Sequence, residues 1–64
     1  MIDETLKTKF LKIYANLPEK IKSEDIISVV EDRPYTWNAA AIEIKNETKI
    51  GEKIINMMKE INII

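Results

Sequence analysis

The chain has 64 residues, a net charge of −1 and neither cysteine nor histidine. A single domain of this length buries only about 60% of its unfolded surface, and disulfides are excluded. Zinc, haem and iron–sulfur groups lack their usual ligands. A good helical core and self-association remain as sources of stability, and the apolar fraction of 45% favours association.

Charge is distributed unevenly along the chain. Residues 1–22 carry +2, residues 23–35 carry −3 and residues 36–64 balance at zero. We expect these opposed charges to meet, within the chain or across a dimer. The chain contains 13 Ile, 9 Lys and 8 Glu residues. The enrichment in Lys and Glu without Cys is compatible with a thermophile, and an AT-rich genome would give the same bias toward Ile, Lys and Asn.

The first predicted helix spans about residues 3–16. Asp3 can cap its N-terminus, and Leu17 before Pro18 ends it because a residue preceding proline is pushed out of the helical region. The apolar stripe that supports this helix comprises Ile2, Leu6, Phe10, Ile13, Tyr14 and Leu17.

Residues 18–31 are harder to assign. Pro18 fits the first turn of a short helix reaching about Lys22, and Ser23 is a candidate N-cap for a segment that ends near Glu31. The β-branched residues in 26–30 favour a strand, whereas their spacing favours a helix. Since the only apparent partner for a strand is 61–64, we predict a helix over 24–31 and keep the strand as the alternative.

Residues 35–64 predict two amphipathic helices joined by a short turn at 46–48. Thr36 and Thr48 are the expected N-caps, and Gly51 inside the second helix predicts a close approach by a neighbouring group. The first stripe comprises Trp37, Ala40, Ala41 and Ile44. The second comprises Ile50, Ile54, Met57, Met58 and Ile61.

These elements predict one all-α domain over residues 1–64. We expect a small bundle of three main helices with one or two short helical turns, the C-terminal pair forming a helix–turn–helix unit. The predicted core comprises Phe10, Tyr14, Ile26, Val30, Trp37, Ile44, Ile54 and Met58.

The C-terminal pair raises the hypothesis of a small nucleic-acid-binding protein, similar to a transcription regulator, that uses residues 36–62. Lys45 stands where such motifs usually carry glycine, and the last helix has two acids and no Arg for guanine contacts. We therefore keep nucleic-acid binding as the alternative and plain packing of the two helices as the main interpretation.

The surplus of apolar residues predicts a protein-interaction module, self-associating as a homodimer through the last two helices. Ile42 lies opposite the apolar stripe of its helix, and the aromatic residues beside Arg33 resemble interface anchors. The candidate interaction surface comprises Arg33, Tyr35, Ala39, Ile42, Ile55, Ile63 and Ile64.

Enzyme chemistry is not expected. The chain has no Cys nucleophile, no His base and a single Gly, so it lacks a phosphate-binding glycine loop. Its adjacent acid pairs suit helix starts and a turn better than a metal site. We therefore expect no cofactor, metal, small molecule or membrane partner. We also expect a cytoplasmic location, because the acidic start of the chain differs from a signal peptide.

Overall fold

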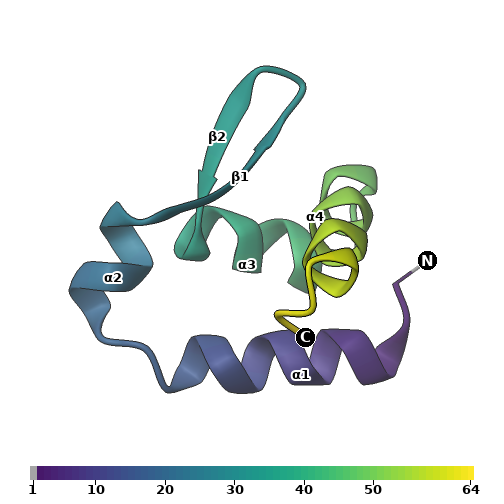
Figure 1. The fold of residues 1–64 in the computed structure, drawn as a ribbon, viewed down its shortest axis with the longest axis horizontal. Helices are drawn as coiled ribbons and strands as arrows, with labels where there is room; N and C mark the ends of the chain where they lie inside the picture. The colour runs from purple at the N-terminus through teal and green to yellow at the C-terminus, as the bar shows by residue number, and fades with distance from the viewer. Residues whose placement is uncertain (1) are drawn as a thin grey trace.

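The computed structural model describes residues 2–64, which form four helices and one two-stranded sheet. The elements in chain order are α1 (Glu4–Ala15), α2 (Glu19–Glu24), β1 (Ile26–Val30), β2 (Arg33–Thr36), α3 (Trp37–Lys45) and α4 (Lys49–Glu60). Figure 1 shows α1 running beneath α3, with α4 beside α3 and the β1–β2 hairpin standing out on the side opposite α1. The fold is mixed α/β, so the all-α prediction is wrong.

The error lies in residues 26–36, which form an antiparallel hairpin. Val30 pairs with Arg33 across a two-residue turn, and Val29 pairs with Pro34. Glu31 and Asp32 in the turn have φ of 52° and 66°, as a tight hairpin turn of type I′ requires. Such turns usually contain Asn-Gly, which is why this acidic pair gave no hairpin signal. Residues 61–64, the expected strand partner, instead follow the end of α4.

The predicted helix starts are confirmed at three positions. Asp3 accepts hydrogen bonds from two backbone N–H groups of α1, at 2.8 and 3.3 Å. Thr36 and Thr48 each accept one from the third residue beyond them, at 3.2 and 3.0 Å. Ser23, in contrast, is not an N-cap: it lies inside α2, where its hydroxyl donates to the Lys20 carbonyl at 3.2 Å.

The core lies between α1, α3 and α4. The predicted core residues that are fully buried are Phe10, Ile44, Ile54 and Met58. Tyr14, Val30 and Trp37 are half-buried and pack against this cluster, with the Trp37 ring 5.6 Å from Phe10. Ile26 is wrong as a core residue, because its side chain is 59% exposed on the hairpin.

Gly51 makes the close contact between α3 and α4 possible. A Cβ atom at this position would lie 2.5 Å from the Glu43 carbonyl oxygen and 3.0 Å from the Ile44 Cα atom. The predicted close approach is therefore confirmed, and the neighbour is the backbone of α3. Thr48 adds to this contact, because its hydroxyl donates to the Glu43 side chain at 2.7 Å.

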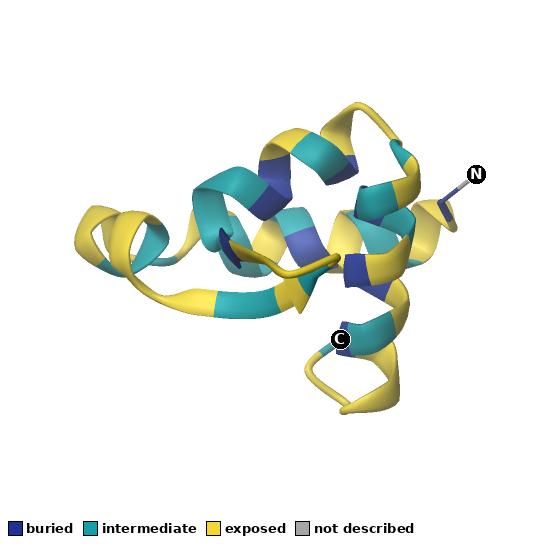
Figure 2. Ribbon diagram, turned by 90° about the horizontal axis from the view of Figure 1, so that it is seen from above, coloured by how far each residue is buried: buried dark blue, intermediate teal, exposed yellow. Residues whose placement is uncertain are grey.

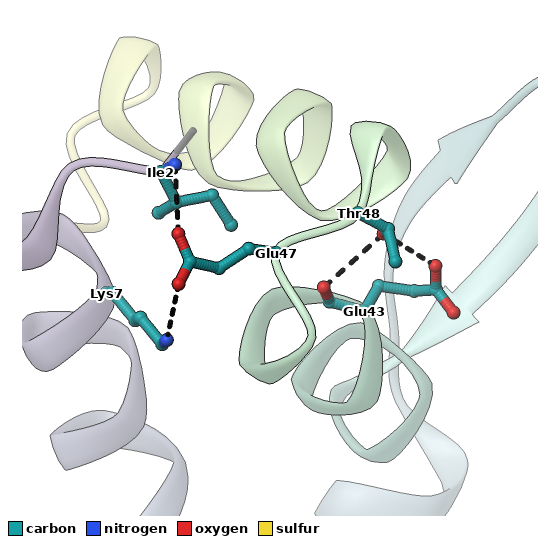
Figure 3. Close-up of polar contacts among 5 residues, drawn as sticks. All are labelled: Ile2, Lys7, Glu43, Glu47 and Thr48. Atoms are coloured by element: carbon teal, nitrogen blue, oxygen red, sulfur yellow. Dashed lines mark hydrogen bonds and ion pairs between the residues drawn. The ribbon is translucent and has the colours of Figure 1, made fainter.

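The turn between α3 and α4 is a Schellman motif. The Thr48 N–H bonds the Glu43 carbonyl at 3.1 Å, and Glu47 takes the left-handed position usually given to glycine, with φ of 52°. Figure 3 shows what its side chain does there: the carboxylate accepts from the Ile2 N–H at 3.4 Å and from Lys7 Nζ at 3.2 Å. Glu47 thus ties this turn to the start of α1.

Gly51→Ala tests the helix contact. We expect a net loss of up to about 2 kcal/mol in the free energy of unfolding, because overpacking against a backbone costs about 1–3 kcal/mol and the gain in helix propensity is about 1 kcal/mol. Asn56→Ala, at an exposed position of the same helix, is the control and should not destabilise the protein. Chemical denaturation measures both. A stabilised Gly51→Ala protein would contradict the close contact.

Glu47→Gln tests the link to α1. The hydrogen bond from Lys7 is the main cause that lowers the pKa of the Glu47 carboxyl below its ordinary value of 4.5. A lowered pKa contributes stability above the ordinary value, and this contribution is lost as pH falls through the folded-state pKa. We expect Glu47→Gln to melt at a lower temperature than wild type at pH 7 and the difference to shrink below pH 4.5. A difference that is independent of pH would exclude an ionic contribution.

Candidate interaction surface

The hairpin presents one apolar face to solvent. Directly paired residues of an antiparallel sheet share a face, so Val29 and Pro34 lie together. Tyr35, the next residue of β2, is buried on the opposite face. Val29 is 68% exposed and Pro34 is also exposed. Along β1, Ile26 and Val29 are exposed and the two residues between them are half-buried, which Figure 2 shows as yellow stretches on either side of a teal one.

A β-bulge adds Ile26 to this face. The pairing runs from Ser28 with Tyr35 to Ile26 with Thr36, so Ile27 is an extra residue in β1. Ile27 packs against the core, whereas Ile26 returns to the side of Val29 and is 59% exposed. We define the outer face of the hairpin as Ile26, Val29 and Pro34.

The remaining exposed large hydrophobic residues lie elsewhere. Ile42 on α3 is 58% exposed, and Ile61 and Ile63 beyond α4 are 54% and 45% exposed. Ile63 follows Asn62, whose φ of 61° turns the chain back over the end of α4. The outer face of the hairpin therefore holds the two most exposed large hydrophobic residues of residues 2–64, on the same face of one strand.

The residues predicted as an interaction surface do not form one surface. Ile55 is 1% exposed and Tyr35 is 8% exposed, so both belong to the core: the helix contact covers Ile55 and the inner face of the hairpin holds Tyr35. Ala39 and Ile64 are half-buried against that core. The exposed members are Arg33, Ile42 and Ile63.

Sequence reasoning missed Ile26, Val29 and Pro34 as surface residues. For Ile26 and Val29 the signal was present in the β-branched composition of 26–30. A helix assigned to this segment places its β-branched residues on one stripe, whereas a strand divides them between two faces. The location of the bulge leaves no mark in a single sequence.

Acidic residues lie at both ends of the outer face. Glu24 and Asp25 directly precede β1, and Glu31 and Asp32 form the turn. Glu31 lies 3.5 Å from Lys53 of α4. This arrangement gives an apolar centre with carboxylates beyond each end, and those at the turn lie beside Lys53 and Arg33.

A second polar cluster lies where α1, α2 and α3 meet. The Tyr14 hydroxyl donates to Asn38, Lys22 Nζ lies 4.5 Å from the centre of the Tyr14 ring, and Lys45 Nζ lies 5.8 Å from it. Lys22 also pairs with Glu19 at 3.5 Å. These are cation–π and hydrogen-bond contacts that fasten α2 to the bundle, and they contain no paired nucleophile and base.

Other kinds of site find little support in residues 2–64. No three acidic side chains are grouped to hold a metal ion. An open hollow of about 320 Å³ lies over α1 and is lined by Glu4, Thr5, Thr8 and Lys9, all from that one helix. None of the helices in this part of the chain combines the length and apolar character needed to cross a membrane.

Comparison with known proteins gives no relative: no family model, no curated protein and no solved structure matches the chain. The functional interpretation therefore depends on the geometry of the chain itself.

Replacing Glu31-Asp32 by Asn-Gly tests the turn that supports this surface. Both positions have positive φ, where Asn and Gly are favoured. The exposed Glu31–Lys53 pair that is lost contributes only about 0–1 kcal/mol. We expect a net gain of about 1 kcal/mol in the free energy of unfolding, since a left-handed non-glycine residue costs about 1–2 kcal/mol. Thermal melting measures it, with Lys53→Gln as the control for the ion pair. A lower melting temperature would contradict the assigned turn.

Proposed function

We propose that this protein is a non-enzymatic protein-interaction module whose contact surface is the outer face of the hairpin. The observation that carries the proposal is the exposure of Val29 (68%) and Ile26 (59%) on one face of the same strand. Burial of a Val or Ile side chain contributes about 1.5–3 kcal/mol. The fold leaves most of this free energy unused, so it is available for binding another polypeptide.

Self-association remains a prediction. Ile55 and much of Ile64, which were expected to contact a second chain, are covered within the same chain. Sedimentation velocity distinguishes a dimer from a monomer of 7.5 kDa.

Nucleic-acid binding by residues 36–62 has less support. Residues 36–64 carry equal numbers of positive and negative side chains, and a phosphate-binding face needs an excess of Lys and Arg. The turn before α4 is occupied by Glu47, whose carboxylate holds Lys7.

Val29→Lys tests the proposed function. Val29 contributes little to the core, so we expect a change of no more than about 0.5 kcal/mol in the free energy of unfolding. Binding should nevertheless be lost, because a charge then lies at the centre of the contact. Thr8→Lys, which adds the same charge on the exposed face of α1, is the matched control.

The measurement is affinity capture by the three proteins from an extract of the native host, followed by mass spectrometry. A partner held by wild type and Thr8→Lys but not by Val29→Lys supports the proposal. Partners held equally by all three would show that the outer face is not the contact surface.

A further inference from the structure

The charges beside the outer face restrict what can bind there. Residues 23–35 contain four acids and one Arg. Lys53 lies near Glu31, whereas Glu24, Asp25 and Asp32 are exposed and make no ion pair among residues 2–64. A ligand on this face therefore meets an apolar centre with two unpaired carboxylates, Glu24 and Asp25, at one end. At the other end it meets one, Asp32, whose neighbour Arg33 pairs with Val30 and so lies on the opposite face of the hairpin.

We propose that the outer face binds a basic amphipathic segment of another polypeptide. Its apolar side chains would pack on Ile26, Val29 and Pro34. Its Lys or Arg side chains would lie beside Asp25 at one end and Asp32 at the other. This inference depends on the proposed function and adds the chemical class of the partner.

The length of β1 between these acids sets the minimum length of that segment. Five residues of β1 span about 16 Å at 3.3 Å per residue. A helix covers this distance in about 11 residues, or three turns. A matching segment thus has apolar side chains on one face over three turns and basic residues toward both ends.

A second copy of the chain fits the same face less well. It would bring another set of four acids and one Arg, and in an antiparallel arrangement each Arg33 could neutralise only one of the three unpaired acids opposite it. Like charges facing each other disfavour such a contact. Addition of a strand is also disfavoured, because Pro34 interrupts β2 and the bulge distorts β1.

The test uses three synthetic peptides of about 14 residues that share one pattern of Leu at helical spacing. The other positions are Lys in the first peptide, Gln in the second and Glu in the third. Binding to the full-length protein is measured by titration calorimetry, and the site is located from ¹H–¹⁵N shifts of the Ile26 and Val29 amides.

We expect the Lys peptide to shift these amides and to bind about tenfold more tightly than the Gln peptide, as expected for several weak surface ion pairs. Its affinity should fall between about 0.05 M and about 0.5 M salt, because salt screens exposed charges. Val29→Lys should abolish binding. Asp25→Asn with Asp32→Asn should bring the Lys peptide to the affinity of the Gln peptide.

The control double variant is Glu4→Gln with Glu60→Gln, which removes the same charge from helix positions outside the hairpin. It should bind the Lys peptide as tightly as wild type does, in contrast to the double Asp variant. Equal loss in both double variants would indicate attraction to net charge alone and would overturn the proposal.

Three other outcomes would overturn it in distinguishable ways. If the Gln or Glu peptide binds the outer face as tightly as the Lys peptide, the basic partner is wrong and the interaction surface stands. If no peptide shifts the Ile26 and Val29 amides, the basic partner is also wrong, and capture by Val29→Lys decides separately whether the face is used at all. Dimerisation that Val29→Lys abolishes would replace the basic partner by a second copy.

Discussion

The close crossing of α3 and α4 at Gly51 is the constraint on which the rest of the structure depends. The Glu43 carbonyl occupies the position that a side chain at residue 51 would need, so the two helices lie close enough for their apolar stripes to interlock. One core then contains both stripes: Ala40, Ala41 and Ile44 from α3, and Ile54, Ile55 and Met58 from α4. The remaining elements add to this pair: α1 brings Phe10, and the hairpin brings Tyr35. Polar contacts reinforce the same corner, because Thr48 caps α4 while its hydroxyl donates to Glu43.

The hairpin has more apolar side chains than this core can cover. Its inner face supplies Ile27, Val30 and Tyr35 to the core, and the bulge in β1 sends Ile26 outward beside Val29. A surface of this kind is small, on the order of a few hundred Å², which is within the range of functional patches on monomers. It is better suited to a short segment than to a stable dimer, since specific interfaces bury about 1,200–2,000 Å² in total.

The charged side chains of the molecule fall into two groups: those that form ion pairs within residues 2–64, and those that do not. At the α3–α4 turn, Glu47 meets Lys7 from the basic N-terminal region. Glu47 belongs to the charge-balanced residues 36–64, so this is not the expected pairing of residues 1–22 with residues 23–35. On the hairpin, Glu31 meets Lys53, while Glu24, Asp25 and Asp32 form no ion pair within residues 2–64. The unpaired acids flank the exposed apolar residues, and this combination is the reason for proposing a basic partner at the outer face.

The local features of this protein were determined by the sequence alone. Asp3, Thr36 and Thr48 start their helices because side-chain oxygens next to an apolar period bond the free N–H groups, and Gly51 signals close packing because few other roles suit glycine inside a helix.

The strand that pairs with residues 26–30 was decided by the tertiary structure. These residues carry both helical spacing and strand composition, and the acidic turn gave no hairpin signal, so only the pairing with 33–36 and the available core could choose between them. The tertiary structure also determined which residues form the candidate site. The contact between α3 and α4 buries Ile55, and Tyr35 lies on the buried inner face of the hairpin. The bulge in β1 leaves Ile26 exposed. Burial of a side chain depends on what packs against it, and that information lies in the assembled fold.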